Sequence, residues 1–76
     1  MGHDSIRDCV ALGRKVRELR REQGVTQAQL AGLANTGIRF ISDLENGKAT
    51  CQIGKVLRVI EALGFDMCIC NPYDRE

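Results

Sequence analysis

The chain has 76 residues, enough for one small domain and too few for two. Eleven lysines and arginines stand against ten aspartates and glutamates, so the formal charge of +1 neither favours nor excludes a nucleic-acid partner, and only the placement of the charges can indicate one. No apolar run approaches the ~18 residues that cross a bilayer, and no signal-peptide core follows the first Met, so we expect a soluble, cytoplasmic protein with no membrane segment.

The first predicted element is a helix that begins at about Cys9 and ends before Gly24, a residue typical of helix C-termini. Asp8 or Ser5 can cap its start with a side-chain oxygen. Residues 1–7 are predicted to be a flexible N-terminus. Apolar side chains recur along this helix at the spacing of one helical face: Cys9, Leu12, Val16 and Leu19.

Charged residues cover the rest of this helix. Arg14 and Glu18 lie four residues apart, which indicates that part of the charge is self-paired on a solvated face. Such a run is more often surface than binding site, and the only DNA contact expected here is one at Arg20 or Arg21. The charged residues are Arg14, Lys15, Arg17, Glu18, Arg20, Arg21 and Glu22.

Two short helices are predicted next. Thr26 offers a hydroxyl cap for a helix that begins at Gln27, and a further helix runs from Gly37 or Ile38 to Asn46. Each is shorter than the ~12 residues that an isolated helix needs, so neither is stable alone. Two such helices joined by the tight connection ANTG predict a helix-turn-helix unit, whose second helix enters the major groove of DNA.

A fourth helix is predicted to end at Gly64, with Ile53, Val56, Leu57, Ile60 and Leu63 as its apolar positions. Residues 65–70, FDMCIC, then alternate with period two, which predicts an extended strand. Because a lone strand leaves its backbone unpaired, we expect it to pair with the same strand of a second copy across a two-fold axis. The alternatives are a disordered tail, or an interface on the fourth helix through Val59. The expected interface residues are Phe65, Met67, Cys68, Ile69 and Cys70, followed by a tail over residues 71–76.

The remaining reactive residues indicate neither a metal nor an enzyme. Cys68 and Cys70 form C-x-C rather than C-x-x-C, and the only histidine is His3, so we predict that the four cysteines are reduced structural thiols, with a C-x-C metal site as the alternative. No nucleophile has an evident base, no Gly-rich loop follows a strand, and no paired carboxylates line a cleft. We therefore predict no catalytic activity and no cofactor.

The sequence of the two short helices resembles a known family. The pattern T-Q-x-x-L-A…I-S-x-L-E-N-G-K is similar to that of the Cro/C1-type (Xre-like) helix-turn-helix family. This resemblance implies an all-α, lambda-repressor-like domain of four to five helices over residues 8–64. It also implies that Glu45 ties the third helix to the first, where we expect Arg14 or Arg17 as its partner. The stretches GIRFISDLENGKAT and KVLRVIEALGFDM are similar to HipB-type antitoxins, in which a short C-terminal strand follows the last helix and the partner is a HipA-type kinase toxin.

The expected DNA contacts lie on the second and third helices and just past the third. Arg39 is the best candidate for reading a base, because its guanidinium can donate two hydrogen bonds to guanine; a surface pair with Asp43 is the alternative. Ile38 either packs inside or touches a thymine methyl, and Phe40 either braces the helix or faces DNA. Gln27 is expected to meet a phosphate, its alternative being a solvated helix-start residue. The full set is Gln27, Gly37, Ile38, Arg39, Phe40, Ser42, Asn46 and Lys48, with Lys48 as a phosphate ligand.

These features together predict a homodimeric, nucleoid-associated transcriptional repressor. It would bind a palindromic operator in double-stranded DNA, with half-sites about 34 Å apart. If the antitoxin resemblance holds, it represses its own operon and binds a HipA-type kinase toxin. The alternatives are a stand-alone Xre-type or phage-like repressor with no toxin, and a protein-binding module that no longer binds DNA, which would show no salt-dependent DNA affinity.

Overall fold

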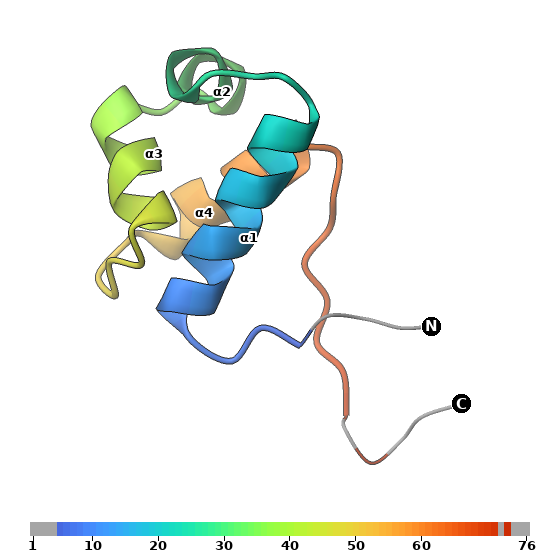
Figure 1. Cartoon of the computed structure of the whole chain (residues 1–76). Helices are drawn as coiled ribbons and strands as arrows, with labels where there is room; N and C mark the ends of the chain where they lie inside the picture. Colours follow the sequence, from blue (N-terminus) through green and yellow to red (C-terminus); the bar gives the residue numbers. More distant parts are fainter. Residues whose placement is uncertain (1–4, 72, 74–76) are drawn as a thin grey trace.

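The computed structural model describes residues 5–71 and 73, and in that range the chain forms four helices and no strand (Figure 1). The helices are α1 (Cys9–Glu22), α2 (Gln27–Ala34), α3 (Ile38–Glu45) and α4 (Ile53–Ala62). The predicted all-α class and all four predicted helices are thus confirmed. Residues 1–4 of the predicted flexible N-terminus, and most of the predicted 71–76 tail, lie outside the described residues.

Local capping sets where the helices begin. Asp8, rather than Ser5, caps α1: its Oδ1 accepts a hydrogen bond from the backbone N–H of Ala11 at 2.7 Å. Thr26 and Gln29 form a reciprocal capping box at the start of α2, with hydrogen bonds of 3.0 and 2.9 Å. These bonds satisfy donors that a helix start leaves free, so the chain enters α1 and α2 at defined residues.

The connection between α2 and α3 is a tight turn at Asn35. Its backbone is left-handed, with φ of 57° and ψ of 50°, a conformation that Asn tolerates better than most residues. The N–H of Thr36 reaches back to the carbonyl of Ala31 at 2.9 Å and closes the end of α2. The predicted helix-turn-helix connection is therefore present.

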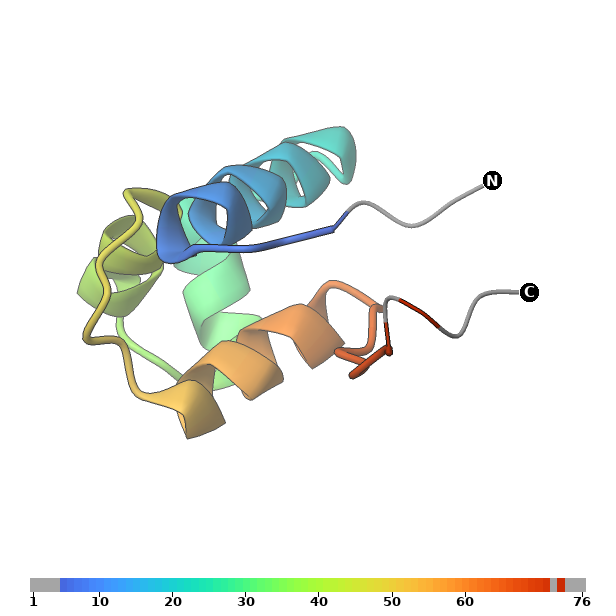
Figure 2. The ribbon, with the colours of Figure 1, turned by 90° about the horizontal axis from the view of Figure 1, so that it is seen from below.

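The hydrophobic core lies where the four helices meet. Helices α2 and α3 bridge α1 and α4, which lie on opposite sides of the molecule (Figure 2). Val59 is fully buried in this core, so the alternative of a dimer interface through Val59 is wrong. Ile53 and Leu57, on the outer side of α4, are 62% and 38% exposed. The core residues are Val16, Leu30, Ala31, Ala34, Ile41, Leu44, Val56, Val59 and Leu63.

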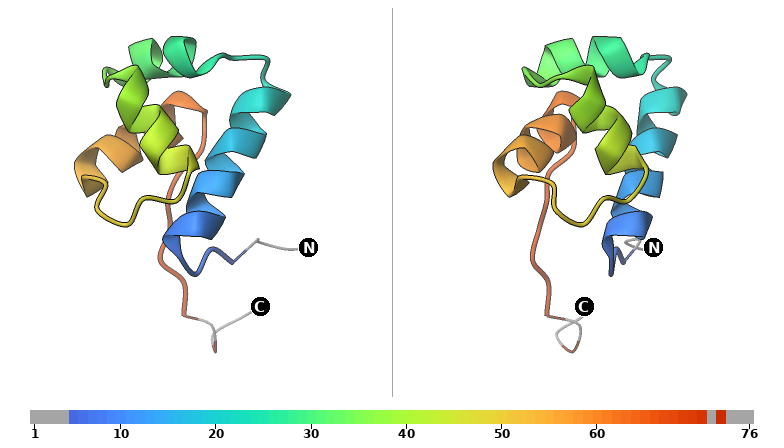
Figure 3. Two further views of the ribbon diagram at one scale, coloured as in Figure 1. Left: turned by 60° about the vertical axis from the view of Figure 1, so that its left-hand side comes forward. Right: turned by 90° about the vertical axis from the view of Figure 1, so that its left-hand side faces the viewer.

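Residues 65–70 follow α4 without forming a strand in the single chain. They run along and past the helices (Figure 3), and all six residues are exposed, the three large apolar ones from 46% at Met67 to 100% at Ile69. A strand exists only with a partner strand, so the predicted pairing depends on a second copy of the chain. In the part of the chain that is described, no helix has the length and apolar character to cross a membrane.

Gly13 lies where α1 and α3 touch. A Cβ at this position would overlap the carbonyl oxygen of Leu44 and stand 2.8 Å from that of Glu45. Both neighbours are backbone atoms and cannot rotate away. A glycine inside α1 thus permits the close approach of two helices, and no pattern in the sequence predicts this contact.

Replacing Gly13 with Ala should lower the free energy of unfolding by about 1–3 kcal/mol, because the added methyl forces α1 and α3 apart. Gly32 is the matched control: it also lies inside a helix, but a Cβ there would meet nothing within 4 Å. Gly32→Ala should therefore stabilise the chain by about 0.5–1 kcal/mol through helix propensity alone. Urea unfolding followed by circular dichroism compares the two. Shifts of the same sign would contradict this account of Gly13.

Candidate nucleic-acid interface

A buried ion pair joins α1 to α3. Arg20 donates from Nε to Oε2 of Glu45 at 2.6 Å and from Nη2 to Oε1 at 3.1 Å. The two side chains are only 11% and 2% exposed. Arg20 also donates from Nη1 to the carbonyl of Val25 at 2.9 Å, which fixes the loop before α2.

This pair corrects two predictions. The partner of Glu45 is Arg20, whereas Arg14 and Arg17 are exposed. Arg20 lies four residues from Val16 and seven from Gly13, so it shares the face of α1 that packs on α3. The helical spacing of Arg20 from Gly13 and Val16 could therefore have identified it as the partner of Glu45. Because Arg20 is buried and paired with Glu45, a DNA contact at Arg20 is ruled out. A DNA contact at Arg21 stays a prediction.

Gln27 brings α2 into the same network. Its Nε2 donates to Oε1 of Glu45 at 3.1 Å, so one carboxylate is held from α1 and from α2. Burial by itself would raise the pKa of Glu45, but the hydrogen bonds from Arg20 and Gln27 and the arginine charge outweigh it, and the pKa lies below its usual value. The bond to Glu45 raises the pKa of Arg20. A charged, fully bonded Glu45 thus sets the position of α3 against α1 and α2.

Helix α3 lies at the surface, with α2 across its N-terminal end and the 46–52 connection leaving its other end (Figure 3). Ile38 is 53% exposed, so it does not pack inside, and its contact with a thymine methyl stays a prediction. Arg39 is exposed on the same first turn. The ion pair that forms at Asp43 is with Lys48 at 3.4 Å rather than with Arg39. The first turn of α3 therefore presents an isoleucine and an arginine to solvent.

Phe40 points the other way. It is partly buried and packs against the core, and the Lys55 ammonium lies 5.7 Å from the centre of its ring. Of its two predicted roles, this packing matches a brace between α3 and α4. Ser42 is half-buried, while Gly37 and Asn46 are exposed.

Three further hydrogen bonds, donated by two side chains that the sequence did not single out, hold the α2–α3 turn and the ends of α1 and α4 together. Arg58 of α4 donates from Nε to the carbonyl of Ala34 at 3.2 Å and from Nη2 to that of Asn35 at 3.5 Å. Gln23 donates from Nε2 to the carbonyl of Leu63 at 2.7 Å. The partners lie 23 to 40 residues apart, and no local pattern marks them.

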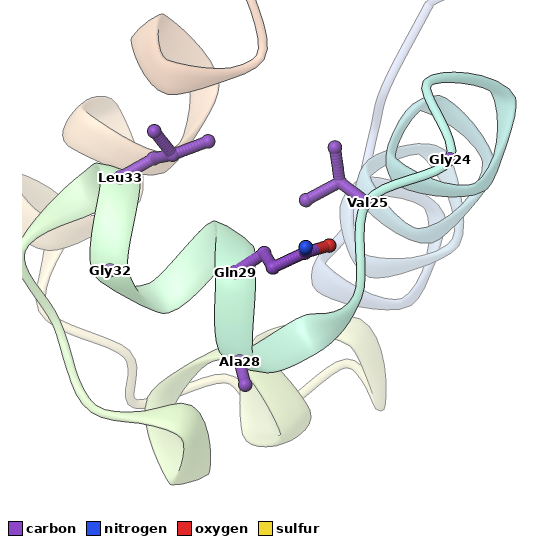
Figure 4. A pocket seen from close by; sticks show the side chains of 6 residues that line it. All are labelled: Gly24, Val25, Ala28, Gln29, Gly32 and Leu33. Atoms are coloured by element: carbon purple, nitrogen blue, oxygen red, sulfur yellow. The ribbon is translucent and has the colours of Figure 1, made fainter.

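A depression of about 540 Å³ lies beside α2, on the surface that it shares with the loop after α1 (Figure 4). Its only polar side chain, Gln29, already belongs to the capping box. No set of acid, base or nucleophile converges there. The lining residues are Gly24, Val25, Ala28, Gln29, Gly32 and Leu33.

Comparisons with known proteins identify relatives of the chain. A family model described as a helix-turn-helix domain matches residues 11–68. The chain is 52% identical, over 92% of both lengths, to an uncharacterized HTH-type transcriptional regulator, y4mF, of Sinorhizobium fredii. It is 36% identical over 56 residues, 72% of this chain and 55% of the relative, to HigA2 of Mycobacterium tuberculosis, which is named as a candidate antitoxin.

Solved structures share the fold. A HipB–O4 20mer complex superposes with a TM-score of 0.84 at 21% identity, covering 92% of this chain and 99% of HipB. HipB in a HipA–HipB–O2–O3 complex gives 0.85 with the same identity and coverage. The restriction-modification controller C.AhdI of Aeromonas hydrophila gives 0.71 at 30% identity, over 84% of this chain and 93% of that one.

Proposed function

Because the chain belongs to the helix-turn-helix domain family, we propose that it is a sequence-specific repressor that binds a palindromic operator as a homodimer. It acts in the cytoplasm, on the nucleoid, and is not an enzyme, in keeping with relatives that are named as regulators. The observation that carries the proposal is the exposed first turn of α3, which the Arg20–Glu45–Gln27 network holds in a fixed position. A recognition helix must expose its side chains to DNA and must be held in a fixed position by the rest of the domain.

In this proposal α3 lies in the major groove. Arg39 reads a guanine, Ile38 touches a thymine methyl, and Gly37 and Ser42 lie beside them.

Phosphates are held at the start of α2 beside Gln27 and at the end of α3. There, Asn46 and Lys48 follow α3, and Lys48 exchanges its half-buried partner Asp43 for a phosphate. Phe40 acts through packing.

We infer further that the protein is an antitoxin that represses its own operon and binds a HipA-type kinase toxin. The fold shared with HipB in a HipA–HipB complex and the similarity to HigA2 support this role. The product of the neighbouring gene is the protein to test. Co-expression of the two proteins should yield a stable complex in size-exclusion chromatography. If the neighbouring gene does not encode a kinase and its product does not bind, the protein is a stand-alone repressor.

Replacing Arg39 with Ala should weaken binding to the specific site by about 1–3 kcal/mol and relax the preference at one base position. Lys48→Ala should weaken binding to all sequences alike and lower the salt slope by about one. Mobility-shift titrations on the promoter of its own gene, at several salt concentrations, measure both effects.

Arg14→Ala is the matched control, since it removes one exposed positive charge from α1 at a residue that is not among the expected DNA contacts. An Arg39→Ala protein that keeps its affinity and its preference would remove Arg39 from the reading role. Binding that is insensitive to salt would contradict DNA binding as the function of this surface.

A further inference from the structure

Two thiols meet on the segment after α4. Cys68 Sγ and Cys70 Sγ lie 3.4 Å apart, and both residues are exposed. The hydrogen bond with Cys70 raises the pKa of the Cys68 thiol. Sulfur atoms in contact on an accessible segment need only a small movement to form a disulfide, whose bond is ~2.05 Å long.

The same two thiols cannot bond to each other within a paired strand. Residues i and i+2 of a strand are about 6.6–6.8 Å apart and point the same way, so their Cβ atoms stay about that far apart. A disulfide requires Cβ atoms about 3.5–4.5 Å apart. A bond between Cys68 and Cys70 therefore bends the chain at these residues and removes the extended conformation.

The two-fold symmetry of the proposed dimer makes this bend costly. In an antiparallel pair about a two-fold axis, residues 68–70 of one copy lie opposite residues near 66 of the other, and the reverse. Bending this stretch in both copies removes both halves of the ladder. The symmetry also places the thiols of both copies on one face of the ribbon, and Phe65, Met67 and Ile69 on the other.

We propose that Cys68 and Cys70 form a reversible dithiol–disulfide site, whose oxidation by a small disulfide such as glutathione disulfide opens the dimer and releases DNA. This inference rests on the proposed function, because it needs the strand-paired dimer. One cysteine thiolate attacks glutathione disulfide, forms a mixed disulfide and releases one glutathione. The second cysteine then attacks the mixed disulfide, forms the Cys68–Cys70 bond and releases the second glutathione. The protein loses two electrons and two protons, and the oxidant becomes two free thiols. Excess thiol reverses both steps.

The test compares the full chain under dithiothreitol and under glutathione disulfide. Mass spectrometry of the peptide carrying both cysteines detects the loss of two hydrogens, and analytical ultracentrifugation gives the dimer dissociation constant. Oxidation should raise that constant at least tenfold, and dithiothreitol should restore it. The variant Cys68→Ser with Cys70→Ser should dimerise and ignore the oxidant. The variant Cys9→Ser with Cys51→Ser loses as many thiols elsewhere and should respond like the wild type.

The outcomes separate the two proposals. A reduced chain that is already monomeric would overturn the dimer of the proposed function, and the switch with it. A reduced dimer that stays equally tight after the Cys68–Cys70 disulfide forms would overturn the switch alone. A disulfide between two copies, or a response lost in the Cys9 and Cys51 variant, would also overturn it.

Discussion

Replacing Arg20 with Met is expected to lower the free energy of unfolding by about 3–5 kcal/mol, a large share of the stability of so small a domain. Glu45 would remain buried, with one hydrogen bond from Gln27 but without the guanidinium that is bonded to both of its oxygens. Water cannot reach a carboxylate that is 2% exposed, so its lost solvation stays uncompensated. Urea unfolding at neutral pH measures the change.

Arg14→Met is the matched control, because Arg14 is an exposed arginine on the same helix and should change stability by no more than about 0.5 kcal/mol. Acid adds a second readout. The folded pKa of Glu45 lies below the unfolded one, so its stabilisation is complete above the unfolded value, about 4.3, and is lost as the pH falls through the folded value. The Arg20 variant should lack this loss. Equal effects of the two variants would contradict the ion pair as a structural centre.

Deleting every residue after Gly64 is expected to weaken operator binding by about 10²–10⁴-fold. Two helix-turn-helix units that are no longer linked lose the effective concentration that a dimer supplies. The helical content should barely change, since the removed side chains are exposed, Phe65 at 47% and Ile69 at 100%. Ultracentrifugation should show a monomer or a much weaker dimer, and circular dichroism an intact fold.

A truncated chain that remains a tight dimer would place the interface elsewhere. Val59 is buried, so the outer side of α4 would then be the surface to test, where Ile53 and Leu57 are exposed. Replacing both with Ser would separate this interface from one made by residues 65–70.

The four helices and the helix-turn-helix unit could be predicted from the sequence alone. The signals were local: Asp8 bonds three residues ahead, Thr26 and Gln29 bond to each other, and Asn35 closes the turn by its own backbone preference. Such interactions join residues only a few positions apart, so they can be predicted without knowing the fold. The pattern that resembles the Xre-like family spans the same stretch, and it led to the family that the comparisons show.

The side chains that meet across the core could not be predicted, because their contacts depend on how the helices pack. Arg20 was chosen among five basic residues by the face of α1 that packs on α3, and Gly13 by the distance between those helices. Arg58 reaches the α2–α3 turn from a helix 23 residues later. The same packing put Phe40 inward and Ile38 outward within the first turn of α3. These outcomes depend on the angle and spacing between helices, which arise when all the buried surfaces are satisfied together, and no stretch of sequence contains that information alone.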